Sequence, residues 1–428
     1  MSGMGPEKGT RPLVLYDGLI FDGTGRQTFR GTVIIRGSLI SDVGTRGEVE
    51  VPSDAEVIDL RGSFLMPGLI DAHLHLTGAR TGRIEEELTT PIGVFFARAV
   101  KDLESLAMAG FTTVVDAGSL VGLHLRDAVK EGTIVGPRVV AAGHVISQTF
   151  GHGDVHYMPV EWVDYRTTRK VTPFTSLLCD GADECRKAAR FALREGADFI
   201  KVMASGGVLS QRDRPEYRQF TLDELRAIVD EASAAGRWVH AHAEGKAGII
   251  NAARAGVRVL AHCDMLDEEA VDEVLRAGSI CVPTLAIDYR LLEEGERLGV
   301  PEWGIAKIRE LLDVHVESAR MAYRAGVRLA TGTDFTGGVG RHGENAEELR
   351  LFVEKVGMTH FDALASATRI AAAAAGLEGR SGEIRKGLLA DLIVVSGNPL
   401  DDIRVLGDQR NVKLVVRDGV ILKDMIRP

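Results

Sequence analysis

The sequence predicts an α/β protein: a (β/α)8 TIM barrel with a small β-sandwich domain built from both ends of the 428-residue chain. Two observations support this fold. In the middle of the chain, eight short apolar runs alternate with helix-like stretches, which is the pattern of a (β/α)8 barrel. At both ends, apolar runs are separated by Asp-Gly pairs, which indicate β-hairpins instead.

The first segment, residues 1–12, reads "MSGMGPEKGTRP" and has no apolar stretch of the kind found in signal peptides. We expect it to be a flexible terminus. The hairpin pattern begins with "LVLYDGLIFDGTG" and returns near the other end in "ADLIVVSG" and "KLVVRDGVIL". We therefore predict a composite β domain from residues 13–66 and 381–428, with the barrel between them over residues 67–380.

The barrel strands are predicted from apolar runs bounded by Gly, Pro or polar residues. In order, these runs are "FLMPGLIDAHLHL", "TTVVDAG", "RVVAAGHVI", "DFIKVMAS", "RWVHAHAE", "VRVLAHC", "SICVPTLA" and "VRLATGTD". Helix-like stretches between them include "FFARAVKDLESLAMAG", "ADECRKAARFALREG", "TLDELRAIVDEASAAG" and "KAGIINAARAG", which end at Gly, a helix C-cap signal. A doubly wound sheet is the alternative, but no GxGxxG follows the first strand.

Composition narrows the class of protein. The chain is 45% hydrophobic with a net charge of −10, and its Lys and Arg residues are scattered, so we expect no nucleic-acid partner. No apolar run reaches the roughly 20 residues of a membrane span. Four cysteines in a chain of this length do not form a disulfide scaffold. A cytoplasmic protein without a membrane partner is expected.

Ionisable residues gather near the predicted carboxyl ends of the strands. In the first strand, Asp71, His73 and His75 alternate along the chain and therefore share one face. The later strands contribute Lys201, His240, His242, His262 and Asp334. Burying so many polar groups without compensation would cost several kcal/mol each. A bound metal would compensate them together, because imidazole and carboxylate groups are common metal ligands.

Lys201 lies between apolar neighbours in "FIKVM" and is expected inside the barrel. Burial lowers the pKa of a lysine, by up to about 3–5 units. A neutral amine can react with CO2 to give a carbamate, an anionic ligand able to bridge two metals. The alternative is a lysine that forms a salt bridge with Asp334 or Asp71, and the residues alone favour neither reading.

The whole pattern resembles the amidohydrolase superfamily: His-x-His on strand 1, Lys on strand 4, His on strands 5 and 6, and Asp on strand 8. The segment "GEIRKGLLADLIVV" is also similar to the usual C-terminal segment of that family. The resemblance implies six metal ligands, which are His73, His75, Lys201, His242, His262 and Asp334. It implies two divalent ions, zinc first with Mn or Co as options, bridged by a carbamylated Lys201. His240 is then a packing or supporting residue, with a ligand role as a minor alternative.

Within the superfamily, "IKVMASGGVLS", "GHGD" and "HGEN" resemble a prolidase-like branch of Xaa-Pro and Xaa-Arg dipeptidases and ochratoxin-hydrolysing amidases, many of them homo-oligomers. The resemblance implies a homo-oligomer that hydrolyses an amide or peptide-like C–N bond by attack of a metal-bridging hydroxide. The expected substrate is a dipeptide, an N-acyl amino acid or an ochratoxin-like amide, with an apolar or aromatic part and in some cases a carboxylate. One departure is "AHAEG", which places Glu244 where the branch often has His or Tyr.

Further residues are candidates for catalysis and substrate binding. Asp334 is expected to accept the proton of the attacking water and pass it to the leaving nitrogen. His152 in "FGHGD" is a candidate donor to the oxyanion, or else an exposed loop residue. His342 in "GRHGEN" is expected either to bind substrate or to cap the following helix. Glu244 could repel a substrate carboxylate or bind a cationic group, and Asp71 is expected to orient a ligand.

The loop after the third strand, residues 150–174, is rich in aromatic residues. Five of its 25 residues are aromatic, or 20% against 5% in the whole chain, and Tyr157 is among them. It also contains Arg166, Arg169 and Lys170, which could bind a carboxylate. A substrate lid and a subunit contact both fit this composition, and long loops in compact domains are often functional.

Two other functions compete with that of a binuclear amidase. A mononuclear deaminase or imine hydrolase would have no need of Lys201, because a bridging carbamate is useful only between two metals. A catalytically silent scaffold would have no need of all six ligand positions, yet all six are filled. Metal analysis separates these hypotheses, with about two, one or no equivalents expected per chain.

Overall fold

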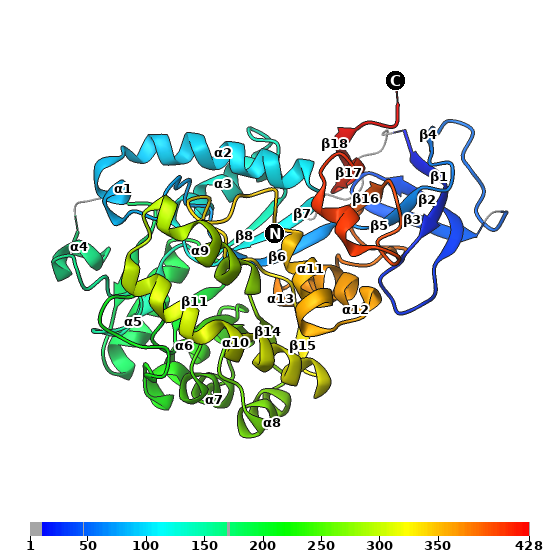
Figure 1. Cartoon of the computed structure of the whole chain (residues 1–428). Helices are drawn as coiled ribbons and strands as arrows, with labels where there is room; N and C mark the ends of the chain where they lie inside the picture. Colours follow the sequence, from blue (N-terminus) through cyan, green and yellow to red (C-terminus); the bar gives the residue numbers. More distant parts are fainter. Residues whose placement is uncertain (1–10, 46, 169–171, 428) are drawn as a thin grey trace.

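The computed structural model describes residues 11–45, 47–168 and 172–427. Its strands form one eight-stranded sheet and two parallel sheets of seven and three strands. Figure 1 shows helices around the parallel strands and, at one side, a β-rich part that holds both the first and last coloured segments of the chain. Among the described helices, none is long and apolar enough to cross a membrane.

The eight-stranded sheet combines strands from both ends of the chain. Its strands are β1 (Leu13–Ile20), β2 (Phe29–Arg36), β3 (Leu39–Thr45), β4 (Glu56–Asp59), β5 (Phe64–Pro67), β16 (Leu392–Val395), β17 (Val412–Arg417) and β18 (Val420–Asp424). They follow the order β18-β17-β16-β5-β1-β2-β3, with β4 paired to β1. The N-terminal and C-terminal segments meet where β16 runs antiparallel to β5. The exact domain boundaries stay a prediction.

We expected a sandwich of two sheets, but the described strands of this part form a single hydrogen-bonded sheet. The reason lies in β1, which pairs with β2, β4 and β5. Its register against β2 shifts between Leu15 and Gly18. A bulge of this kind bends a strand, so β1 can continue one sheet around the apolar cluster that includes Ile20, Val33 and Leu392.

The parallel strands carry most of the predicted site. The three-stranded sheet has the order β6 (Leu69–Leu74), β7 (Phe111–Asp116) and β8 (Arg138–Ala141). The seven-stranded sheet has the order β10 (Ser176–Leu178), β9 (Val145–Ser147), β11 (Ile200–Met203), β12 (Val239–Ala243), β13 (Val259–His262), β14 (Ile280–Val282) and β15 (Arg328–Leu329). After β15 the chain returns to β6, where the amide of Ala72 donates to the carbonyl of Thr331.

Helices alternate with these strands along the chain. They are α1 (Ile84–Thr89), α2 (Ile92–Met108), α3 (Leu120–Glu131), α4 (Val160–Val163), α5 (Ala182–Arg194), α6 (Leu222–Ala234), α7 (Lys246–Ala255), α8 (Glu268–Ala277), α9 (Leu285–Leu298), α10 (Glu302–Arg324), α11 (Glu347–Leu351), α12 (His360–Ala365) and α13 (Ala371–Ala374). Two π-helical turns, η1 (Phe352–Val356) and η2 (Ser366–Ile370), and a 3-10 turn, η3 (Ile403–Gly407), complete the elements.

The helix ends follow ordinary capping chemistry. Thr221 and Glu224 form a capping box at the start of α6, and α3, α7, α8 and α9 each end at a glycine in the left-handed conformation. The four predicted helix-like stretches correspond to α2, α5, α6 and α7, so these predictions are confirmed.

Two predicted strands are divided in the structure. The run "FLMPGLIDAHLHL" becomes β5, which belongs to the eight-stranded sheet, and β6, which belongs to the parallel part. The run "RVVAAGHVI" becomes β8 and β9, because Gly143 has a φ of 70° and turns the chain between them. Just after the loop of residues 150–174 the chain forms a short strand, β10, that the sequence pattern did not predict.

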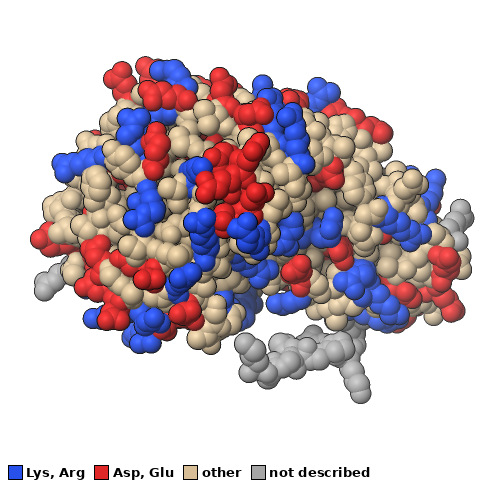
Figure 2. Space-filling model, turned by 90° about the horizontal axis from the view of Figure 1, so that it is seen from below, with Lys and Arg blue, Asp and Glu red and all other residues tan. Residues whose placement is uncertain are grey.

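Figure 2 shows the charge distribution on one face of the molecule. Basic and acidic side chains are interspersed over most of it, while Lys and Arg gather across the middle beside a compact acidic patch. This face therefore presents both signs of charge rather than one uniform field.

Candidate metal centre and active site

The six predicted ligands come from the carboxyl ends of the parallel strands. His73 lies near the end of β6 and His75 directly after it, while Lys201, His242 and His262 lie in β11, β12 and β13, and Asp334 follows β15. All six line one pocket with a volume of about 260 Å³. The structure therefore brings together residues that are up to 261 positions apart, from His73 to Asp334.

The donor atoms of these residues lie close to one another. The Oδ1 atom of Asp334 is 3.0 Å from Nε2 of His75 and 3.4 Å from Nε2 of His73. The amine nitrogen of Lys201 is 3.2 Å from the same Nε2 of His73. Possible ligand atoms of His73, His262 and Asp334 all lie within 4.8 Å of each other, so these three residues form a possible metal site.

Each of the four histidines uses one ring nitrogen for a contact outside the predicted centre. His73 Nδ1 is 2.9 Å from His240 Nε2, and His75 Nδ1 is 3.1 Å from the carbonyl oxygen of Gly118. The outer partners of a ligating histidine fix the ring and its tautomer. These two contacts leave Nε2 of both rings available as ligand atoms.

The second pair of histidines follows the same rule. Nε2 of His242 donates to the carbonyl oxygen of Gly206 at 3.0 Å, which leaves Nδ1 available. Nδ1 of His262 lies 2.8 Å from the hydroxyl of Thr284, which leaves Nε2 available. The donor set therefore consists of four oriented imidazoles, one amine and one carboxylate, and this composition fits divalent zinc or a similar ion.

Burial controls the protonation of these groups. It lowers the pKa of His73 to about 3, and it places the pKa of both His242 and His262 well below 6.5. It also lowers the pKa of Lys201 to about 7, although Asp334 and Asp116 oppose this shift. Neutral imidazoles and an amine that loses its proton readily are the forms that metal binding and carbamate formation require.

For the pKa of Asp334, contacts with neighbouring side chains outweigh burial. Burial alone would raise the pKa of its carboxyl, but the contacts with His73 and His75 bring that pKa well below 3.8. The carboxylate is therefore ionised in the site. Its backbone is held in place because its amide donates to the carbonyl oxygen of His73 at 2.7 Å.

A buried network holds the first strand against the segment before Asp334. The carboxyl group of Asp71, which is 1% exposed, accepts hydrogen bonds from the hydroxyl of Thr333 and the side-chain amide of Asn345, both at 2.7 Å. It also accepts from the backbone amide of His73 at 3.0 Å. Asp71 thus orients the strand that carries two ligands, and the sequence signal was its shared face with His73.

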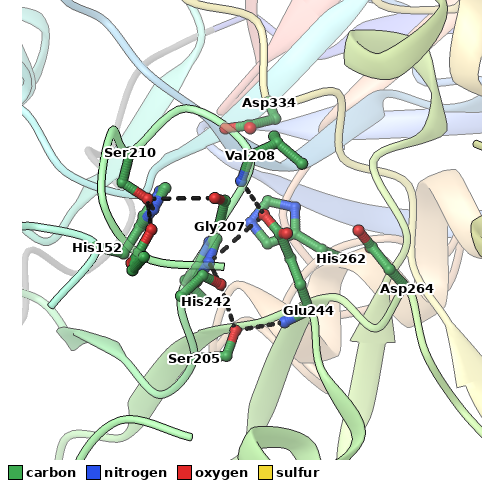
Figure 3. A network of polar contacts seen from close by, with 12 residues as sticks. His152, Ser205, Gly207, Val208, Ser210, His242, Glu244, His262, Asp264 and Asp334 are labelled. Carbon is green, nitrogen blue, oxygen red and sulfur yellow. Dashed lines mark hydrogen bonds and ion pairs between the residues drawn. The ribbon is translucent and has the colours of Figure 1, made fainter. Parts of the chain in front are cut away.

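The loops near the second pair of histidines bring further polar groups to the site (Figure 3). His152 stacks on His242 with ring centroids 4.1 Å apart, and its Nδ1 lies 2.7 Å from the hydroxyl of Ser210. Glu244, 3% exposed, has one oxygen 3.5 Å from Nε2 of His242, and its other oxygen has no hydrogen-bond partner among the described residues. It lines a smaller cavity of about 50 Å³ that shares His152 and His242 with the main pocket.

The other predicted substrate residues have different positions. Tyr157 lines the main pocket and is 41% exposed. His342 does not line it, because its Nε2 donates to the carbonyl oxygen of His75. Arg166 does not line it either, since its guanidinium binds the carboxylate of Asp164 and the carbonyl oxygen of Leu178. Arg169 and Lys170 lie outside the described residues.

Sequence reasoning missed most of the pocket wall. Arg83 and Glu87, around α1, and Ile287, Val300 and Trp303, from α9, α10 and the link between them, all line the pocket. Burial raises the pKa of Glu87 to about 7, and the side chain of Glu87 forms no hydrogen bond with any described residue. The signal for the apolar residues was weak, because α9 and α10 read as ordinary amphipathic surface helices.

A sequence model described as the amidohydrolase family matches residues 64–422. The chain belongs to the amidohydrolase family. It is 35% identical to ochratoxinase from Aspergillus niger over 423 residues, which cover 96% of this chain and 86% of that protein. It is 27% identical to imidazolonepropionase from Symbiobacterium thermophilum, with coverage of 92% and 87%. Family membership identifies the chain as a hydrolase.

Solved structures agree with this assignment. The crystal structure of A. niger ochratoxinase has a TM-score of 0.88 and 32% identity to this chain, covering 97% of it and 96% of the ochratoxinase chain. A Xaa-Pro dipeptidase with methionine bound in its active site has a TM-score of 0.85 and 33% identity, with coverage of 96% and 99%. These similarities confirm the predicted prolidase-like branch of the family.

Proposed function

We propose that the chain is a binuclear metal-dependent amidohydrolase that cleaves an amide or peptide-like C–N bond in a small substrate. The observation that carries this proposal is the convergence of six donor groups on one pocket, in which each histidine has one nitrogen held and the other available. The similarity to ochratoxinase and to a Xaa-Pro dipeptidase supports the same chemistry.

The fold that supports this function is proposed to be one closed (β/α)8 barrel, with the composite β domain beside it. Two backbone hydrogen bonds support closure: Ala72 donates to Thr331 at 2.8 Å, and Thr333 donates to His73 at 2.9 Å. On the other side, the amide of Asp198, just before β11, donates to the carbonyl oxygen of Ala141 at the end of β8 at 2.9 Å.

In this proposal, His73, His75 and Asp334 would hold one divalent ion, and His242 and His262 a second. Lys201, as its carbamate, would bridge the two. A free amine cannot do this, since it has a single lone pair. When bound, the ions would lower the pKa of a water molecule and polarise the substrate carbonyl. Zinc is the first choice of metal, with Mn or Co as alternatives.

The protein residues then divide the remaining tasks. Asp334, ionised and 23% exposed at its side chain, accepts the proton of the attacking water and transfers it to the leaving nitrogen. His152 lines the same pocket, and its Nδ1 contacts the hydroxyl of Ser210, which donates its own proton to Asp213. His152 would therefore donate to the oxyanion from Nε2 in its protonated form. His240 and Asp71 position His73.

The pocket favours a substrate with an apolar or aromatic part. Tyr157, Phe174, Leu209 and Trp303 are among its lining residues, together with Val300. Arg83 is the lining guanidinium that could receive a carboxylate, in place of the predicted Arg166. Dipeptides, N-acyl amino acids and aryl amides share these features. A homo-oligomer in the cytoplasm stays a prediction.

The test of this proposal is Lys201→Ala in parallel with a substrate panel. The wild-type protein is expected to contain about two metal equivalents, to carry added CO2 on Lys201 in a crystal structure, and to hydrolyse at least one amide class. Lys201→Ala is expected to lose metal and activity together, and acetate or propionate should restore part of both by replacing the carbamate. A metal-loaded, active protein with an unmodified Lys201 would contradict the proposed carbamate bridge. Absence of hydrolysis across the whole panel would contradict the proposed substrate class.

A further inference from the structure

A second, larger cavity lies away from the metal centre, between the parallel strands and the eight-stranded sheet. Its volume is about 610 Å³, and its lining comes from α3, from the starts of β8 and β12, from the end of α13 and from the turn between β17 and β18. The predicted ligands lie at the carboxyl ends of the parallel strands, whereas this cavity lies at their amino ends. It is therefore separate from the proposed active site, and a ligand bound in it would be independent of the proposed function.

The cavity is lined by more positive than negative side chains. The positive ones are Arg126, Lys130, Arg138, Arg237, Arg380 and Arg417. The negative ones are Asp127, Asp198 and Asp418. Arg138 also contacts a buried carboxylate behind the lining, that of Asp391, at 2.7 Å. Even with this fourth carboxylate, the described residues leave an excess of two positive charges.

The carboxylates of the lining are already shared. Asp198 contacts Arg126 at 3.1 Å and Arg237 at 3.9 Å. Asp418 contacts both Arg138 and Arg417, the second at 3.5 Å. Asp127 contacts Arg126 as well, at 2.9 Å, so no protein carboxylate in the described lining is free to neutralise the remaining cations.

Several donors facing this cavity lack an acceptor among the described residues. The side chains of Lys130 and Arg380, which are both exposed, form no hydrogen bond or ion pair with any described residue. The indole nitrogen of Trp238 and Nε of Arg417 are buried without a hydrogen-bond acceptor, apart from the long ion pair of Arg417 with Asp418. Burial lowers the pKa of Arg417, and the nearby guanidinium of Arg138 adds to this effect. Buried donors normally have acceptors, so the two buried groups, with the exposed cations of Lys130 and Arg380 beside them, suit a ligand that supplies several acceptors at once.

We propose that this cavity binds a small oxyanion carrying at least two negative charges, of the phosphate or polycarboxylate type. Such an anion offers oxygen acceptors to guanidinium groups, which bind phosphate and carboxylate in a bidentate manner. Because Arg417 belongs to the eight-stranded sheet and Arg126 and Arg237 to the parallel part, the bound anion connects the two parts of the fold.

The proposal is tested by calorimetric titration of the full-length, metal-loaded protein with inorganic phosphate and with succinate, at constant ionic strength set by sodium chloride. The test variant is Lys130→Gln/Arg237→Gln/Arg380→Gln, which removes three cations whose side chains make at most one long ion pair. The control variant is Arg61→Gln/Lys101→Gln/Arg410→Gln, which removes three cations with side chains 85%, 72% and 87% exposed. Both variants change the net charge by the same amount.

Wild-type protein is expected to bind at least one of the two anions saturably, with a Kd of about 1 mM or tighter. The test variant should bind at least tenfold more weakly, and the control within about twofold of wild type. Whichever of phosphate and succinate binds more tightly identifies the ligand as a phosphate or a polycarboxylate. Absence of saturable binding for both anions overturns the proposal. Binding that both variants retain also overturns the proposal, because an anion at the metal centre would behave in this way. Binding that both variants lose equally overturns it too, because an effect of net charge would lower both affinities by the same amount.

Discussion

The contact between His240 and His73 offers a quantitative test of the metal centre. His240 Nε2 lies 2.9 Å from His73 Nδ1, and the two side chains are 1% and 0% exposed. His240→Phe replaces one aromatic ring by another of similar size, and its neighbours already include the ring of Phe199, 5.6 Å away between centroids. The substitution therefore removes a hydrogen-bond partner while it largely preserves packing.

The magnitude follows from the tautomer of His73. In the metal-free variant, His73 can place its proton on Nε2 and donate it to Asp334, which lies 3.4 Å away. In the metal-loaded variant Nε2 must be the ligand, so the proton returns to Nδ1, which is buried and has lost its acceptor. A buried unpaired donor costs about 1–3 kcal/mol, and tenfold in affinity corresponds to about 1.4 kcal/mol. We expect metal affinity to fall about 10–100-fold, the range typical of such supporting residues.

The assay is a zinc titration of the chelator-stripped protein against a chromophoric competitor, with circular dichroism to confirm the fold. His144→Phe is the matched control. His144 is also 1% exposed and has one ring nitrogen bonded, to the hydroxyl of Thr175, but it contacts none of the six predicted ligands. If His240→Phe binds zinc within threefold of wild type, or if His144→Phe loses as much affinity as His240→Phe, the positioning role of His240 is refuted.

Three further changes probe the proton transfer, the oxyanion donor and the pocket wall. Asp334→Asn is expected to keep at least one metal but to lower kcat at least about 100-fold, because an amide cannot accept the proton; a rate above about a tenth of wild type would refute this role. Gly207→Ala would place a Cβ 2.4 Å from the ring of His152 and so displace this ring. We therefore expect turnover to fall at least about tenfold with metal content unchanged. Unaltered turnover would show that His152 is dispensable. Burial raises the pKa of Glu87 to about 7, so the folded protein holds this proton more tightly than the unfolded chain, and stability is lost as pH rises from about 4.5 to 7. Because glutamine does not ionise, the free energy of unfolding of Glu87→Gln relative to wild type should rise by about 1–3 kcal/mol between pH 5 and pH 8. Urea unfolding measures this difference, and a difference that does not change with pH would contradict the raised pKa of Glu87.

The ligand positions could be predicted because they obey strand geometry. His73 and His75 alternate with apolar residues, Lys201 interrupts an apolar run, His262 is the next-to-last residue of its run, and Asp334 ends its own. Parallel strands bring their carboxyl ends to one edge, so these residues converge without any knowledge of the loops. The sequence could also predict the helices α2, α5, α6 and α7, because their apolar periodicity and terminal glycines are local signals.

The pocket wall could not be predicted in the same way, because its members depend on how long segments fold over the strand ends. Arg166 illustrates the difficulty. Composition favoured a free cation in the aromatic-rich loop, but Asp164, two residues earlier, takes up the guanidinium with a contact of 2.7 Å. Glu87 and Trp303 reach the pocket from α1 and α10, and no short-range pattern distinguishes them from exposed residues of a surface helix.

Backbone strain at the centre also leaves no mark in the sequence. His262, Cys263, Thr284 and Asp334 all have φ between 56° and 74°, although none of them is glycine. Each such residue costs about 1–3 kcal/mol and persists only where its surroundings hold it. Here the holding contacts belong to the metal centre itself: the amide of Asp334 donates to the carbonyl oxygen of His73, and the hydroxyl of Thr284 contacts His262. The strained turns and the oriented ligands therefore depend on one another, which explains why a sequence rule that assigns positive φ to glycine overlooks the residues that shape this site.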